Sequence, residues 1–191
     1  MAKAPTTDRV DRFNELSQRR AIPLADLADD IARICHRMAE RFRAGGELVV
    51  FGNDGPSTGA GHVAVEFVHP VIVGERALPA VSLTSGVATL AGVAARAGCE
   101  ETFAHQIRCL GEPSDIALGL SADGTCENVA RGLAVAAELG MLTVALTGGD
   151  GGRIVADHVL VAEDPLVVEE IHVTAYHLPW ELTHVFLEGV A

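Results

Sequence analysis

The sequence predicts one α/β domain, a three-layer αβα sandwich in which helices cover both faces of a five-stranded parallel sheet. Five short apolar runs alternate with segments of helical periodicity, a pattern typical of parallel strands joined by crossover helices. The chain has 191 residues, enough for one large core, and its 20 glycines suit an architecture with many strand-to-helix turns. A glycine-rich loop follows the first apolar run, which favours a ligand site at the carboxyl end of the sheet.

The N-terminal part of the chain, residues 1–25, is polar and is expected to form an arm or a short helix ahead of a single domain spanning 26–191. The first helix of that domain is predicted over 26–44, where apolar residues recur at helical spacing. Asp26 belongs to the residue types that cap helix N-termini, and Gly45 is suited to ending the helix.

The remaining elements alternate in type along the chain. The strands are predicted at 47–51, 80–83, 116–120, 142–146 and 158–161, and the intervening helices at 58–69, 86–110 and 126–139. The last segment, 166–188, is long and amphipathic, and Pro179 should kink or interrupt it. A monomer would leave the apolar stripes of the first and last helices exposed, so we expect an oligomer.

Charge and composition limit the classes of molecule that this protein is expected to bind. A formal net charge of −12 argues against nucleic acid, because phosphate backbones are bound by basic surfaces, and leaves a small molecule as the expected ligand. No apolar stretch is long enough to span a bilayer, and the N-terminus has no apolar signal-peptide core. The four cysteines have no CxxC spacing, so we expect reduced, mostly buried thiols in a cytoplasmic protein.

Two pairs of acidic and basic residues are the strongest candidates for chemistry. His62 and Glu66 are four residues apart on the helix that follows the first glycine loop, so they share one helix face. Glu169 and His177, on the last helix, are separated by about 80° around an ideal helix, so both can face one cleft. Any one of these histidines alone is more often a structural residue than a ligand. Two pairs on separate helices favour a site for a divalent metal.

His172 lies on nearly the same helix face as Glu169. Its sequence position fits two interpretations: a residue that supports the site, or a residue of the core.

Several motifs together resemble the phosphoheptose isomerase family of the sugar isomerase (SIS) fold. They are FRAGGELVVFGNDG (42–55), GLSADGTCENV (119–129), AAELGMLTVALTGGDGG (136–152) and EEIHVTAYH (169–177). Members of this family interconvert sedoheptulose 7-phosphate and a heptose phosphate. The resemblance implies a flavodoxin-like sheet and a homotetramer whose N- and C-terminal helices form a central bundle, with the active sites between subunits.

The same resemblance assigns roles to residues of this chain. It implies Glu66 as the base and His177 as the acid of an aldose–ketose isomerisation. It also implies a metal, zinc in some members, held by His62, Glu66, Glu169 and His177. Glu169 stands where the family has glutamine, and its carboxylate is a hard anionic ligand that should hold a divalent cation at least as well.

The loops that would hold the substrate depart from the family pattern. The expected substrate-binding residues are Asn53, Gly55, Ser57, Ser121, Asp123, Thr125 and Glu169. The phosphate loop, Ser-Thr-Ser-Gly-Asn-Ser in the family, reads Ser-Ala-Asp-Gly-Thr-Cys at 121–126, so Asp123 places a carboxylate where a phosphate oxygen would lie. Asp54 brings a second carboxylate to the first loop. Both aspartates have an alternative role as helix N-caps.

Three functions are therefore compatible with the sequence. The first is an SIS-type isomerase whose substrate differs from the family's because of the altered phosphate pocket. The second is a non-catalytic SIS scaffold that binds other proteins, and the third is a metal-dependent accessory or ligand-sensing protein. The cluster of two histidines and two glutamates favours the enzyme or the metal binder over the scaffold.

Overall fold

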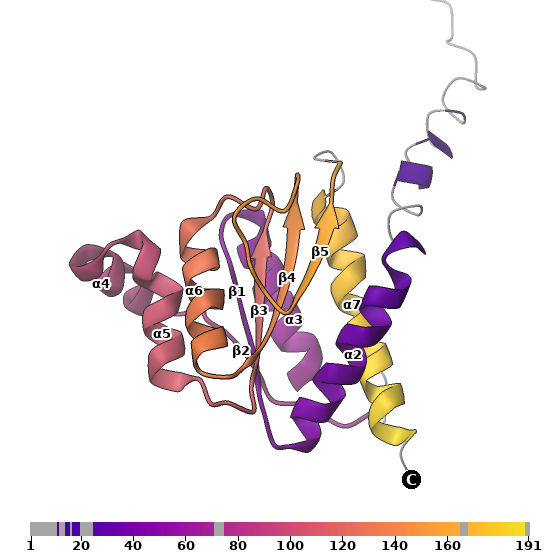
Figure 1. The fold of residues 1–191 in the computed structure, drawn as a ribbon, viewed down its shortest axis with the longest axis horizontal. Helices are drawn as coiled ribbons and strands as arrows, with labels where there is room; N and C mark the ends of the chain where they lie inside the picture. The colour runs from indigo at the N-terminus through magenta and orange to yellow at the C-terminus, as the bar shows by residue number, and fades with distance from the viewer. Residues whose placement is uncertain are drawn as a thin grey trace, which may run out of the picture.

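The computed structural model describes residues 11, 14–15, 17–19, 25–70, 75–164 and 168–189. Most of the predicted N-terminal arm lies outside these residues. All five strands are parallel and form one sheet in the order β2-β1-β3-β4-β5, which confirms the predicted flavodoxin-like architecture (Figure 1). The strands are β1 (Leu48–Gly52), β2 (Ala80–Ser82), β3 (Ile116–Ser121), β4 (Leu142–Gly148) and β5 (His158–Ala162). Each begins and ends within two residues of its predicted bounds.

Helices cover both faces of this sheet. They are α2 (Ala28–Arg43), α3 (Gly55–Val68), α4 (Val87–Ala97), α5 (Thr102–Leu110), α6 (Glu127–Glu138) and α7 (Val168–Glu188), with a short 3₁₀ turn at Cys99–Glu101. Alternate strand residues point to opposite faces, so the apolar strands serve two cores. Val50, Leu118 and Val144 pack with α2, α3 and α7 on one face, whereas Val49 and Ala117 pack with α5 and α6 on the other.

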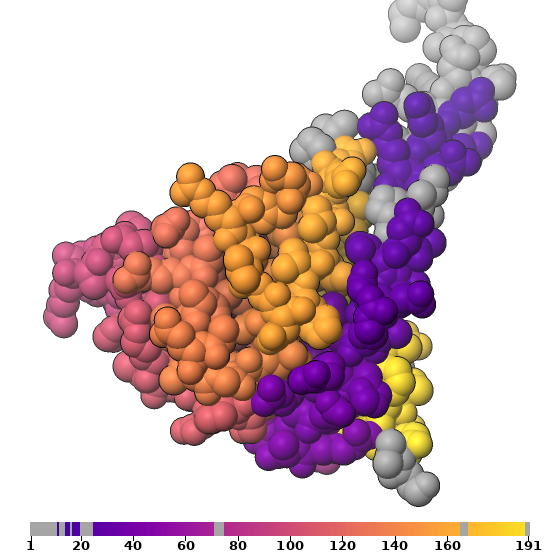
Figure 2. All heavy atoms as spheres, in the orientation of Figure 1, coloured from indigo at the N-terminus to yellow at the C-terminus, as the bar shows by residue number. Residues whose placement is uncertain are grey.

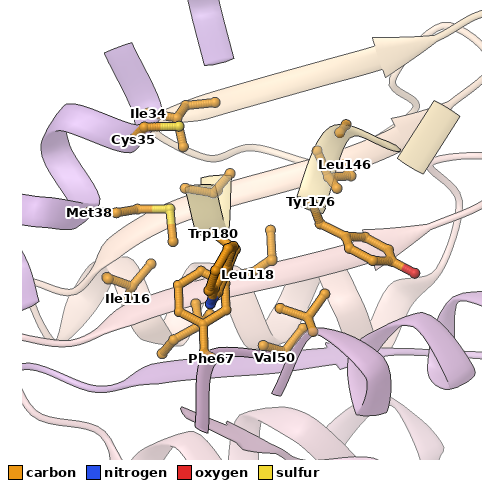
Figure 3. Packing of buried hydrophobic residues seen from close by; sticks show 14 of the residues in the cluster. Ile34, Cys35, Met38, Val50, Phe67, Ile116, Leu118, Leu146, Tyr176 and Trp180 are labelled. Atoms are coloured by element: carbon orange, nitrogen blue, oxygen red, sulfur yellow. The ribbon is translucent and has the colours of Figure 1, made fainter. Parts of the chain in front are cut away.

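The core between the sheet and α2, α3 and α7 holds most of the large side chains. Phe67 of α3 is 1% exposed, and its ring stacks on Phe42 of α2 with the centroids 5.8 Å apart. Figure 3 shows Trp180 among these residues, whereas the ring of Tyr176 extends away from the cluster and carries its hydroxyl at the outer end. The hydroxyl of Tyr176 is therefore directed away from the core between the sheet and α2, α3 and α7.

The structure corrects several boundary predictions. Helix α2 begins after Leu27, which occupies the N-cap position, so Asp26 does not cap it. The segment predicted as one helix over 86–110 is broken at Gly98, whose φ of 99° ends α4. Pro179 lies inside α7 and does not interrupt it.

The cysteines differ from expectation in their burial. All four are free thiols, but only Cys35 is buried; Cys99 and Cys109 are exposed and Cys126 is half-buried. Within the described ranges, no helix is both long and apolar enough to cross a membrane.

The first and last helices lie side by side on one edge of the molecule, as Figure 1 shows. The apolar stripe of α2, which includes Ile31, Ile34 and Met38, is buried within the single chain. The expectation that a monomer exposes this stripe is therefore wrong, because the sheet and α7 already cover it.

Helix α4 is the element that the chain leaves uncovered. None of its residues is buried although most of them are apolar, and Val87 is 74% exposed. Figures 1 and 2 show that the α4 region lies at the end of the molecule opposite α2.

Candidate functional site

The candidate site lies where the strand order reverses. Strands β1 and β3 are neighbours, but the chain between them visits β2 on the other side of β1, so the loops after β1 and β3 diverge at the carboxyl edge. Crevices of this kind are the usual ligand sites of open α/β sheets.

The loop after β1 is tightly formed. Asp54 occupies the N-cap position of α3 with a φ of 52°, and its side chain makes no capping bond. Its backbone carbonyl instead accepts hydrogen bonds from the Ser57 N–H at 3.0 Å and the Ser57 hydroxyl at 2.6 Å. Ser57, one of the predicted substrate contacts, is therefore already hydrogen-bonded within the protein.

Asn53 pairs with a residue that the sequence did not single out, Asn128 of α6. The Asn53 amide donates to Oδ1 of Asn128 at 2.7 Å, and the Asn128 amide donates back to Oδ1 of Asn53 at 3.0 Å. Asn128 also donates to the Thr102 hydroxyl at 3.2 Å. This pair joins the loop after β1 to the helix after β3 and lines a cavity of about 510 Å³ together with Ser57 and Thr84.

Three of the predicted metal and catalytic residues converge on one point. Nε2 of His62 lies 3.1 Å from Oε1 of Glu66, and Nε2 of His177 lies 3.0 Å from the same oxygen. One ligand atom from each residue lies within 4.8 Å of the other two. The Glu66 side chain is 12% exposed, whereas the two imidazoles are 46% and 42% exposed. The carboxylate is therefore shielded while both rings remain accessible.

Hydrogen bonding fixes how His177 faces that carboxylate. Its Nδ1 lies 2.6 Å from the Val173 carbonyl oxygen, which can only accept, so Nδ1 carries a proton. In the neutral ring, Nε2 is then an unprotonated acceptor facing a carboxylate oxygen. Two acceptors at 3.0 Å repel unless a proton or a cation lies with them. The two atoms can therefore share a proton, as an acid–base pair does, or they can both be ligands of a divalent cation.

Tyr176 completes the aromatic surroundings of the group. Its ring centroid lies 5.7 Å from that of His62 and 5.2 Å from that of His177. Burial raises the pKa of the Tyr176 hydroxyl, and the negative charge of Glu66 raises it further. The hydroxyl therefore stays protonated at neutral pH.

Glu169, the fourth predicted ligand, lies outside the group of three. It is in the first turn of α7, and eight residues of helix place it about 12 Å along the axis from His177. Its carboxylate lies against Gly55, where a Cβ atom would meet Oε1 at 2.0 Å. The two residues line a cavity of about 360 Å³ between α3 and α7. The other lining residues are Pro56, Thr58, Gly59, His62, Leu120, His172, Val173 and Tyr176.

The loop after β3 uses Asp123 as an internal anion. Its carboxylate accepts hydrogen bonds from the Thr125 N–H at 2.9 Å, the Thr125 hydroxyl at 2.8 Å and the Ser121 hydroxyl at 3.5 Å. These bonds, those of Thr125 first, lower the pKa of Asp123. Because α6 begins only at Glu127, Asp123 is not its N-cap. Both donors of Thr125, its N–H and its hydroxyl, are therefore taken by this carboxylate and not free for an external anion.

Ser121 is buried and supports the loop from below. Its hydroxyl oxygen also accepts a hydrogen bond from the Gly124 N–H at 3.0 Å. Gly124 has a φ of 73°, and a Cβ there would lie 2.6 Å from the Gly151 carbonyl oxygen. The loops after β3 and β4 are therefore packed against each other, which holds Asp123 in place.

Comparisons with known proteins agree with this architecture. The profile of the SIS domain matches residues 13–148. A phosphoheptose isomerase of Desulfovibrio desulfuricans is 38% identical over 173 residues, covering 87% of this chain and 82% of that protein. One from Roseiflexus is 35% identical over 157 residues, covering 80% and 79% of the respective chains.

Solved structures give the same result. The phosphoheptose isomerase of Neisseria gonorrhoeae superposes with a TM-score of 0.83 at 26% identity, over 94% of this chain and 98% of that one. The phosphoheptose isomerase of Francisella tularensis superposes with a TM-score of 0.82, also at 26% identity, over 93% and 98% of the two chains.

Proposed function

The chain belongs to the SIS domain family, and within it to the phosphoheptose isomerase family, and on this basis we propose that it interconverts an aldose and a ketose form of a small sugar. One observation carries the proposal: two imidazole nitrogens lie 3.0 and 3.1 Å from the same oxygen of the shielded Glu66 carboxylate. Ordinary core packing does not require these three polar groups to converge.

The reaction needs a base for a proton on carbon and an acid for the neighbouring carbonyl oxygen. Glu66 is assigned as the base, which takes the proton from one carbon and returns it to the next. His177 is assigned as the acid, because the Val173 carbonyl holds its Nδ1–H and directs Nε2 to the site. In the metal-free form, a proton on Nε2 lets His177 protonate the carbonyl oxygen of the substrate. If Nε2 instead held a metal, it would carry no proton, and the metal would supply the polarisation of the carbonyl in its place.

His62, Glu66 and His177 would also hold a divalent metal, with zinc favoured by the two imidazole ligands. A bound metal would polarise the substrate carbonyl and stabilise the negative charge that develops on its oxygen. Glu169 is assigned to substrate contact, because its carboxylate lies on the cavity wall and not with these three residues.

The substrate class follows from the loop after β3. A sugar phosphate is the substrate type of the family, but Asp123 already occupies the N–H and the hydroxyl of Thr125 in this loop. A phosphate about 4 Å from that carboxylate would meet a repulsion on the order of 1 to 4 kcal/mol, depending on the solvent exposure of the pair. We therefore infer that this protein prefers a sugar that carries no phosphate at this position, or binds sugar phosphates more weakly than its relatives do.

We also propose that the functional form is a homotetramer. The apolar and unburied surface of α4 supports assembly, because a monomeric protein rarely exposes such a surface. Light scattering at micromolar concentration should give four times the mass of the chain, 20.0 kDa. A monomer would contradict this part of the proposal.

The proposed activity is tested by incubating zinc-loaded protein with sedoheptulose 7-phosphate and, separately, with sedoheptulose, and separating the products by chromatography. We expect conversion, and a smaller preference for the phosphorylated sugar than a phosphoheptose isomerase shows in the same assay. A folded, zinc-binding protein that converts neither sugar would support the accessory-protein alternative. Failure to bind zinc as well would support the scaffold.

A further inference from the structure

We propose that Tyr176 is a specificity-determining residue whose hydroxyl donates a hydrogen bond to an oxygen of the sugar chain held in the cavity between α3 and α7. The inference rests on the proposed function and deepens it, because it names a binding contact outside the proton-transfer group. The ligand part that it implies is a polyol or hydroxyketone segment, bound through uncharged oxygen atoms.

The first observation is that the hydroxyl of this buried side chain has no partner. Tyr176 is 3% exposed, and its contacts with His62 and His177 are made by the ring. No group of the described residues forms a hydrogen bond with its hydroxyl. The hydroxyl of a buried tyrosine usually finds a partner. The donor of Tyr176 is therefore left for a molecule that enters the cavity.

The second observation is that the hydroxyl lies at the wall of this cavity. Tyr176 of α7 and Gly59 of α3 both line it. A Cβ atom at Gly59 would lie 3.5 Å from Cε1 and 3.7 Å from the hydroxyl oxygen of Tyr176, so the phenol reaches from α7 to α3. Figure 3 shows the ring directed away from the core with the hydroxyl at its outer end.

The accessibility of the hydroxyl separates it from the other unpaired polar atoms. Among the described residues, the side-chain atoms that are both buried and unpaired are Nε2 of His172, Nε1 of Trp180 and Oγ1 of Thr183. The Tyr176 hydroxyl is not one of them, although it has no partner either, so it is in contact with open space. A ligand in the cavity can therefore reach this donor.

The third observation is the chemistry of the opposite end of the cavity. Glu169 precedes Tyr176 by seven residues, so about two turns of α7 place both on one helix face, about 10 Å apart along the axis. A carboxylate accepts hydrogen bonds and repels anions, whereas a phenol donates. A chain with several hydroxyls can donate to Glu169 and accept from Tyr176. The volume of about 360 Å³ is in the range of small-molecule sites.

The position of Tyr176 gives the contact its role in specificity. Its ring centroid lies 5.7 Å from that of His62 and 5.2 Å from that of His177, so its hydroxyl binds the ligand beside the proton-transfer group. A ligand without an oxygen at this position would leave the hydroxyl unpaired. Sites that hydrogen-bond a substrate oxygen discriminate strongly against analogues that lack it.

The test is titration calorimetry of zinc-loaded protein with sedoheptulose and with sedoheptulose 7-phosphate. Tyr176→Phe removes the hydroxyl and keeps the ring, and should weaken binding of both sugars about three- to tenfold, the effect of one lost hydrogen bond. Thr183→Val is the matched control, because it removes another unpaired hydroxyl of α7 that does not line the cavity. It should bind both sugars as wild type does.

Three results with Tyr176→Phe would overturn the assignment. The first is unchanged affinity for both sugars. The second is a loss confined to sedoheptulose 7-phosphate, which would place the contact on the phosphate. The third is a loss of zinc affinity, which would assign the effect to the group of His62, Glu66 and His177.

A second measurement covers the case in which Tyr176→Phe does not fold. The chain contains one tyrosine, so wild-type protein labelled with ¹³C at tyrosine Cζ gives a single resonance. This resonance should shift at saturation with either sugar, because a donated hydrogen bond changes the electron density of the phenol. Sugar binding with an unmoved resonance would overturn the role of Tyr176 alone. Wild-type protein that binds neither sugar would overturn the proposed function and this role together.

Discussion

Removing the internal anion of the loop after β3 should increase the affinity of this protein for phosphate. In Asp123→Asn the side-chain oxygen can still accept the Thr125 N–H, now 2.9 Å away, so the loop keeps one of its bonds. The negative charge is lost, and the amide nitrogen that replaces Oδ2 donates to the Thr125 hydroxyl oxygen, so this bond becomes neutral and reverses its direction. The variant therefore changes the charge of the loop more than its shape.

The magnitude follows from the exposure of the side chain. Two unit charges about 4 Å apart repel by about 1 kcal/mol in water and about 4 kcal/mol near a protein surface. Because Asp123 is exposed, the lower part of this range applies, about 1 to 2 kcal/mol. That corresponds to a gain of about 5- to 30-fold in phosphate affinity. The weakened loop bonds should cost about 1 kcal/mol in the free energy of unfolding.

Calorimetry with inorganic phosphate measures the effect directly. Asp150→Asn is the matched control, because Asp150 is also an exposed loop carboxylate that accepts a backbone hydrogen bond, from Gly152 at 2.9 Å. It removes the same charge without freeing a donor in the loop after β3. Equal phosphate affinity in wild type and Asp123→Asn would refute the assignment of Asp123 as an internal anion. An equal gain in phosphate affinity in Asp123→Asn and Asp150→Asn would show that the net charge alone causes the effect.

Three further results are expected. Phe67→Ala should lower the free energy of unfolding in urea by about 3 to 5 kcal/mol, since the ring is 1% exposed and stacked on another ring; a loss below about 1 kcal/mol would contradict this packing. Burial raises the pKa of the Cys35 thiol to about 12, so iodoacetamide at pH 8 should modify Cys99 and Cys109 but leave Cys35 intact by mass spectrometry. The free energy of unfolding should decrease as the pH drops below 6.5. Burial lowers the pKa of His172 in the native state, so below this pH the unfolded chain binds a proton at His172 that the native protein does not. His172→Gln should flatten that fall, and an unchanged pH profile would contradict the assigned burial.

The strands and the first acidic–basic pair could be predicted because their signals are local. β-Branched and apolar runs such as that of β1 specify a buried strand, and spacing of four residues places His62 and Glu66 on one helix face. The bounds of helices were less predictable. A left-handed glycine at Gly98 divides one predicted helix, and Pro179 is accommodated inside α7.

Contacts between distant segments were not predictable from the sequence alone. Helical periodicity gives the angle between Glu169 and His177 around α7. It does not say which of the two residues contacts Glu66, because that contact depends on how α7 crosses α3. The pairing of Asn53 with Asn128 joins residues 75 positions apart. Asp123 could be identified as a charge in the phosphate loop, but its bonds to Thr125 depend on the loop conformation.

The role of Glu66 as the base is tested most directly by the turnover number of Glu66→Gln, measured with zinc-loaded protein and the sugar that wild type converts. The amide keeps the size of the side chain but cannot take a proton, so kcat should fall by about 10²- to 10⁴-fold. Glu181→Gln, an exposed position on the same helix as His177, should retain wild-type activity. A folded Glu66→Gln variant with kcat within about twofold of wild type would contradict proton transfer by Glu66.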